Sequence, residues 1–125
     1  MDIPEIYIKM AEKAEEIQKF RLFGQNKQGD YFWLPKFPHL MITSDMDTRK
    51  IPDGAVWLPL QHQLQAMVTG EFTTLASLVR KFHDWYFKFY AEQNVLFTSM
   101  EQLWLSFVMK ERYSKVWNGT EWVKG

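Results

Sequence analysis

The segment Thr98–Val123, TSMEQLWLSFVMKERYSKVWNGTEWV, decides the fold, because it marks a helix and a hairpin in succession. Thr98 and Glu101 have the spacing of a capping box, in which a hydroxyl and a carboxylate bond the first free amides of a helix. Lys110 and Arg112 fall in the last expected turn, where the helix dipole favours cations. The apolar positions between these signals predict a buried stripe of Met100, Leu103, Trp104, Phe107 and Val108.

The dipeptide Asn118-Gly119 then predicts a two-residue type I′ turn between two short strands. In that register Trp117 lies opposite Thr120, and Lys115 lies opposite Trp122. Both tryptophans and Lys115 therefore share one face of the hairpin. A lone hairpin is marginally stable in water, so we expect the tryptophan face to pack on the helices or to join other strands. The opposite face is predicted to hold Val116, Glu121 and Val123.

Apolar residues at helical spacing predict three more helices, at about residues 4–20, 59–68 and 74–92. Thr73 or Thr74 is expected to cap the last of them. The second half of 74–92 is apolar nearly all round, which predicts either a central helix or one that presents aromatics to a partner. Short strands are predicted at 31–34, 40–43 and 55–58. The predicted stripe of 4–20 is Tyr7, Met10, Ala11, Ala14, Ile17 and Phe20, and that of 74–92 is Leu75, Leu78, Val79, Phe82, Tyr86 and Phe89.

The predicted fold is a single α+β domain over residues 1–125. About four helices pack on a small, mainly antiparallel sheet that ends in a C-terminal β-hairpin. A chain of 125 residues is long enough to bury its own core. The 6 Trp, 10 Phe and 5 Tyr are an aromatic excess that a core or an interface must accommodate.

The amino-acid composition argues against several classes of function. The 15 basic and 15 acidic residues cancel, which leaves no long-range field to attract nucleic acid or an anionic membrane. The absence of cysteine removes disulfides, thiol nucleophiles and cysteine zinc sites. The acidic N-terminus has no apolar signal-peptide core, and no run reaches the length of a membrane span. We therefore expect a soluble, intracellular protein.

Catalytic and metal motifs are not positively indicated. The three histidines lack zinc spacing, and no nucleotide-binding or nucleophile-elbow motif occurs. Asp45 and Asp47 form a D-x-D pair that fails the spacing of a calcium loop; they remain weak candidates for a two-carboxylate metal site beside the turn-forming interpretation. The sequence predicts no cofactor and a protein that is not an enzyme.

Three surfaces are candidates for binding. Two suit a protein partner: the uncharged polar face of the 59–68 helix and the aromatic second half of the 74–92 helix. The third is the tryptophan face of the hairpin, whose rings and lysine would suit the stacked bases of single-stranded nucleic acid. The candidate residues are Gln61, Gln65, Trp85, Phe87, Lys115, Trp117 and Trp122.

The segments VWLPLQHQLQAM at 56–67 and SMEQLWLSFVMKERYSKVWNGTEW at 99–122 resemble small phage and prophage proteins of unknown function from low-GC Gram-positive bacteria. The resemblance implies a phage-related accessory protein, and it carries no catalytic residues across. The leading hypothesis is therefore a non-catalytic accessory protein that binds another protein of the phage or host. The alternative is a single-stranded nucleic-acid-binding accessory protein of phage replication, and the third is a small metal-dependent enzyme.

Overall fold

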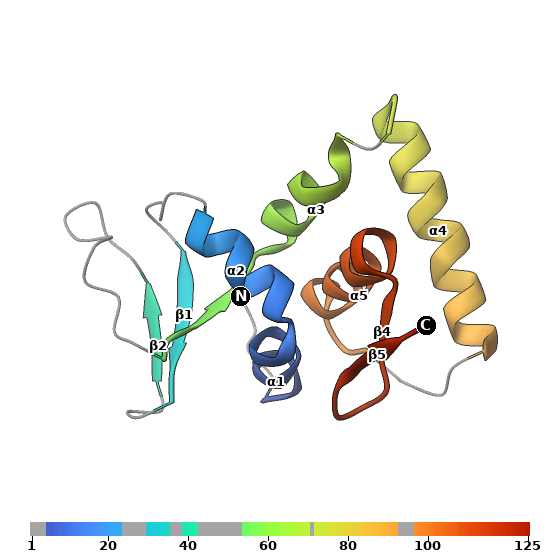
Figure 1. The fold of residues 1–125 in the computed structure, drawn as a ribbon. Helices are drawn as coiled ribbons and strands as arrows, with labels where there is room; N and C mark the ends of the chain where they lie inside the picture. The colour runs from blue at the N-terminus through green and yellow to red at the C-terminus, as the bar shows by residue number, and fades with distance from the viewer. Residues whose placement is uncertain (1–4, 24–29, 36–38, 43–53, 71, 93–96) are drawn as a thin grey trace. The chain divides into compact units, whose positions relative to one another are not determined.

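The computed structural model describes residues 5–23, 30–35, 39–42, 54–70, 72–92 and 97–125 (Figure 1). The chain divides into two compact units, Met1–Leu60 and Gln61–Gly125. Each unit combines helices with short antiparallel strands, so the predicted α+β class is confirmed. The single domain over residues 1–125 stays a prediction.

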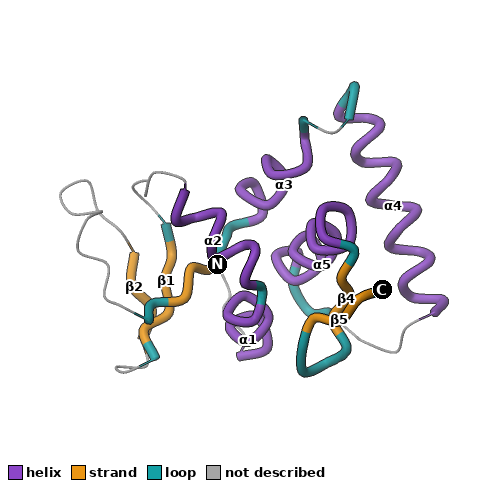
Figure 2. Tube along the Cα trace, viewed as in Figure 1, coloured by secondary structure: helices purple, strands orange, loops and turns teal. Residues whose placement is uncertain are grey.

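The first unit begins with two helices, α1 (Glu5–Lys13) and α2 (Glu15–Phe23), where the sequence predicted one (Figure 2). The single residue between them is Ala14, whose amide donates to the carbonyls of both Met10 and Ala11. No glycine or proline marks this break, so the uninterrupted stripe gave no sign of it. The stripe itself is confirmed at its five described side chains, which are all fully buried: Tyr7, Met10, Ala11, Ala14 and Ile17.

The strands of the first unit are β1 (Tyr31–Leu34), β2 (His39–Ile42) and β3 (Val56–Leu58), each within a residue of its predicted range. They form one antiparallel sheet in the order β2-β1-β3. Phe32 and Leu34 of β1 are buried, whereas Tyr31 and Trp33 are half-buried, so β1 alternates. Both α1 and α2 pack against β3, and all three residues of β3 are buried.

Side chains from the two helices complete the polar bonding of the β3 strand. The Gln18 amide nitrogen donates to the Trp57 carbonyl at 2.9 Å, and the Gln18 amide oxygen accepts from the Trp57 N–H at 3.0 Å. The amide and carbonyl of a strand residue lie on the same edge, so this edge of Trp57 faces away from β1. The Tyr7 hydroxyl donates to the Pro59 carbonyl just beyond the strand. The outer edge of β3 at Trp57 is thereby paired with a side chain.

The second unit holds the helices α3 (Gln61–Thr69), α4 (Leu75–Glu92) and α5 (Met100–Tyr113). The most buried of them is α5, on which Gln102 and every residue from Trp104 to Met109 are buried. Met100, placed in the buried stripe by the sequence, is 45% exposed. Helix α3 packs on α5, and the guanidinium of Arg112 donates to the carbonyl of Met67 in the last turn of α3 at 2.7 Å.

The cap of α5 lies one residue later than predicted. Ser99 is the N-cap, and its hydroxyl accepts from the amide of Gln102 at 3.2 Å. The Gln102 side chain reaches back to the Thr98 amide and hydroxyl, at 3.0 and 3.2 Å. The predicted Thr98–Glu101 capping box is therefore replaced by one in which Ser99 is the cap and the Gln102 side chain, not that of Glu101, reaches back. The predicted cap of α4 is confirmed at Thr74, whose hydroxyl accepts from the Ser77 amide at 3.0 Å.

The C-terminal hairpin forms from β4 (Lys115–Trp117) and β5 (Trp122–Lys124) and is a separate two-stranded sheet. Its register differs from the prediction: Trp117 lies opposite Trp122, and Lys115 lies opposite Lys124. The cause is Asn118, whose side-chain oxygen accepts from the amides of Thr120 and Glu121 at 2.9 Å. These bonds hold Asn118–Glu121 as a four-residue connection instead of a two-residue turn.

Candidate protein-binding surface

Helix α4 uses one side to pack on α5. The ring of Phe82 stacks on Trp104, with centroids 4.1 Å apart and an interplanar angle of 11°. Trp85 meets the ring of Phe107 edge-on at 5.6 Å. Such aromatic contacts stabilise a core beyond the area that they bury. Among the side chains of α4 from Leu75 to Phe89, Leu78 and Phe89 are the most buried.

A second side of α4 is apolar and exposed. Four residues at successive intervals of four form one continuous row along the helix surface: Leu75, Val79, His83 and Phe87. Leu75 is 68%, Val79 62% and Phe87 61% exposed, and the ring of His83 lies 4.6 Å from that of Phe87. We call this row the α4 ridge. Its exposure is notable because large apolar residues spaced along one helix face are normally buried.

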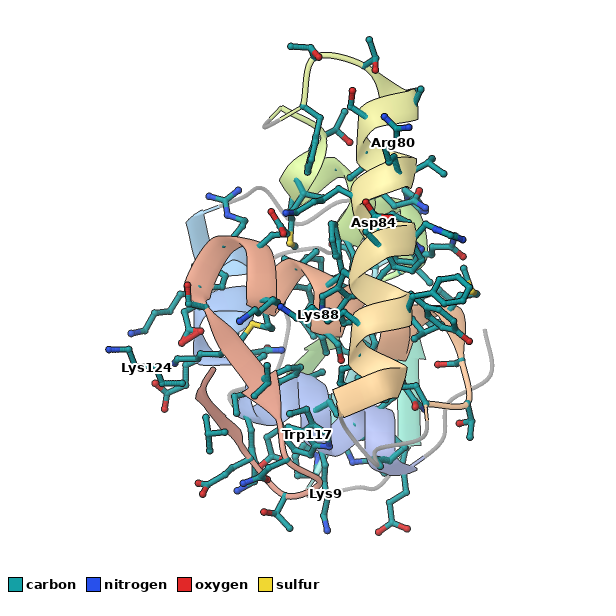
Figure 3. All side chains as sticks on the ribbon, turned by 90° about the vertical axis from the view of Figure 1, so that its right-hand side faces the viewer. Lys9, Arg80, Asp84, Lys88, Trp117 and Lys124 are labelled. Atoms are coloured by element: carbon teal, nitrogen blue, oxygen red, sulfur yellow. The ribbon has the colours of Figure 1, made fainter. Side chains whose placement is uncertain are left out.

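A charged row runs beside the α4 ridge. Arg80, Asp84 and Lys88 follow one another along one side of α4 (Figure 3). All three are exposed, and the Asp84 carboxylate lies 3.8 Å from the His83 imidazole. An exposed apolar stripe bordered by charged residues is typical of a surface that binds another protein.

The candidates that the sequence offered for a protein partner differ in their exposure. Gln61 and Gln65 are half-buried on α3, and the Gln65 carbonyl accepts from the Thr69 hydroxyl. Trp85 belongs to the packed side of α4, with its ring also 5.7 Å from that of Phe82. Phe87 alone among these candidates is strongly exposed, and it lies on the α4 ridge.

The three hairpin candidates share one face, as predicted. Trp117 is fully buried, and its ring lies 5.2 Å from that of Trp122. Trp122 and Lys115 are half-buried. The ring of Trp117 is therefore taken up by the core, and the part of this face that meets solvent consists of Trp122 with its flanking lysines.

The remaining candidates concern metal ions. Asp45 and Asp47 lie outside the described residues. Within the described ranges, no group of three His, Cys, Asp or Glu side chains is arranged to hold a metal ion. His62 and His83 are exposed on separate helices.

Sequence reasoning missed most of the α4 ridge. Leu75 and Val79 were assigned to the buried stripe with Leu78 and Phe82, and that assignment is wrong. The overlooked signal is that the apolar residues of α4 fall into two adjacent rows of four-residue spacing. One helix packed on one neighbour can bury only one such row completely.

None of the helices in the described part of the chain combines the length and the hydropathy needed to cross a membrane. The chain matches no protein-family model, no curated protein and no solved structure.

Proposed function

We propose that this chain is a non-catalytic phage or prophage accessory protein that acts by binding another protein through the α4 ridge. The observation that carries the proposal is the exposure of Leu75, Val79 and Phe87 on a helix whose other side is already packed. The apolar face is thus not an unfinished core contact of α4 with α5.

Burial of the α4 ridge would supply a substantial part of the free energy that a specific contact needs. Burying a large apolar side chain contributes about 1.5–3 kcal/mol, so three that are roughly two-thirds exposed would supply on the order of 3–6 kcal/mol. This is comparable with the lower range of costs for bringing two chains together. A partner would add its own apolar surface and further contacts at the rim.

The phage assignment rests on the segments at 56–67 and 99–122 and on their resemblance to phage and prophage proteins. As part of the same proposal we place the protein in the cytoplasm of the bacterial host. The zero net charge supports a protein partner over a polyanion, because no long-range field gathers phosphate.

Photo-crosslinking in phage-infected cells tests this proposal. A photoreactive residue at Val79 is expected to yield covalent adducts to a protein, identified by mass spectrometry. The matched control places the same residue at Ala66, which is exposed on α3 in the same unit. Adducts that are absent at position 79, or equal at positions 79 and 66, would count against the α4 ridge as a binding surface.

A second candidate function is single-stranded nucleic-acid binding on the hairpin. The observation that favours it is the direct pairing of Lys115 with Lys124 beside Trp122. A partly exposed aromatic ring flanked by cations can stack a base while the cations bind the phosphate backbone. Trp122→Ala should then abolish a salt-dependent mobility shift of a labelled oligonucleotide, with folding checked by circular dichroism. A salt-independent or absent shift of the wild-type chain refutes this candidate.

A further inference from the structure

We infer that the protein bound at the α4 ridge is a second copy of this chain, with the two α4 helices antiparallel across a two-fold axis. The inference rests on the proposed function and names its partner. It is carried by the order of charges beside the ridge: Arg80 positive, Asp84 negative, Lys88 positive.

The charges select the direction and the register. A two-fold axis level with Phe82 places Arg80 of each copy opposite Asp84 of the other, giving two attractive pairs. An axis level with Asp84 instead opposes Arg80 with Lys88 and Asp84 with itself. A parallel two-fold pair carries the two charged rows to opposite sides of the interface, so it forms no attractive pair between them. Attractive pairs favour one arrangement and like-charge pairs disfavour another, so an antiparallel pair offset from Asp84 is selected.

The apolar residues select the same axis independently. The α4 ridge runs from Leu75 to Phe87, so its midpoint is level with Lys81, one residue from Phe82. One residue is a rise of about 1.5 Å along a helix. Near this axis Leu75 meets Phe87 of the second copy and Val79 meets His83. Rows with four-residue spacing interdigitate in the commonest class of helix packing.

A second position of the two-fold axis also forms attractive charge pairs, but α4 is too short for it. An axis level with Tyr86 pairs Asp84 with Lys88 of the second copy. It also carries Leu75 and Val79 opposite positions 97 and 93, beyond Glu92, the last residue of α4. The apolar half of the ridge would then have no facing helix. Charge order and apolar spacing therefore agree on one arrangement.

Sedimentation velocity on the full chain over a range of concentrations tests the inference. The wild type is expected to self-associate, and Val79→Glu is expected to be monomeric throughout. Ala66→Glu, the same change at an exposed position of α3, should leave the association unchanged. Circular dichroism checks that each variant is folded, which the exposure of both positions favours.

Charge exchange tests the register. Arg80→Asp and Asp84→Arg should each weaken self-association by roughly tenfold or more, because each creates two like-charge contacts. Mixing the two variants should restore association, because each copy then meets the opposite charges of the other. Pairs within a helix are the same before and after mixing, so only contact between copies explains a recovery.

The outcomes separate this inference from the function on which it rests. A wild type that stays monomeric, or variants that do not recover on mixing, overturns the second-copy arrangement. If a monomeric chain still crosslinks from position 79 to a different protein, the inference fails and the protein-binding function stands. If neither association nor crosslinking occurs, both fail.

Discussion

Replacing Gln18 with methionine should destabilise the first unit through the edge of β3. The Gln18 side chain bonds the N–H and the carbonyl of Trp57, at 3.0 and 2.9 Å, and also donates to the Ala11 carbonyl at 3.0 Å. Methionine preserves the length and unbranched shape of the side chain but supplies none of these bonds. The Trp57 residue is 5% exposed, so water cannot readily replace them.

The expected loss of stability comes from the N–H and the carbonyl of Trp57, which both lose their hydrogen-bond partner. Leaving a buried donor or acceptor unpaired costs about 1–3 kcal/mol, so the two together should lower the free energy of unfolding by roughly 2–6 kcal/mol. The Ala11 carbonyl adds little, because it also accepts from the Ala14 amide. Each kcal/mol lowers the melting midpoint by roughly 2–8 °C for domains of this size range.

Urea denaturation followed by tryptophan fluorescence and circular dichroism measures the change. Lys19→Met is the matched control, since it makes the same replacement at the next, exposed position of α2. The control should change the free energy of unfolding by no more than about 0.5 kcal/mol. If Gln18→Met is as stable as that control, the side-chain amide is not satisfying the edge of β3.

Three further predictions concern the ends of α5 and use the same denaturation assay. Ser99→Ala should lower the free energy of unfolding by about 1 kcal/mol through loss of the helix cap; an unchanged value would contradict the assigned cap. Ser114→Gly should raise it by about 0.5–1 kcal/mol, because Ser114 ends α5 with a left-handed φ of 53° that glycine adopts more easily; a decrease would refute this. Arg112→Met should lower it by about 1 kcal/mol, since an exposed cation bonds the Met67 carbonyl at the end of α3; wild-type stability would mean that this bond is negligible.

The elements whose signals are local could be predicted from the sequence. Proline and glycine bounded the strands β1 and β3, and Thr74 capped α4 where its hydroxyl indicated. These signals act within a few residues, so the sequence contains nearly all of their physics. The α+β class followed from them.

Competing local signals could not be resolved. Both Thr98–Glu101 and Ser99–Gln102 have capping-box spacing, and the structure uses the second because Gln102 is buried and bonds Thr98. Asn118-Gly119 is likewise compatible with hairpin connections of more than one length. The Asn118 side chain decided for a four-residue one by accepting from two later amides. In each case hydrogen bonds of one side chain, which the sequence pattern does not show, decided the outcome.

The sequence pattern also did not show which helix of the second unit is the most buried. Apolar residues nearly all round the second half of α4 suggested either a central helix or one that presents aromatics to a partner. Yet it is on α5 that even the polar Gln102 and Ser106 are buried. Gln102 tolerates burial because Thr98 satisfies its side chain. A pattern that counts polar residues as exposed therefore underestimates α5. The converse error, counting every apolar residue as buried, assigned Leu75 and Val79 to the core and concealed the α4 ridge.

The most direct measurement of the central claim is the thiol reactivity of Val79→Cys, because the chain contains no other cysteine. Maleimide modification should be fast in the dilute purified protein and at least several-fold slower in phage-infected cells, where a bound protein covers the α4 ridge. Ala66→Cys should react at similar rates in both settings. Equal rates for Val79→Cys in both would contradict protein binding at the α4 ridge.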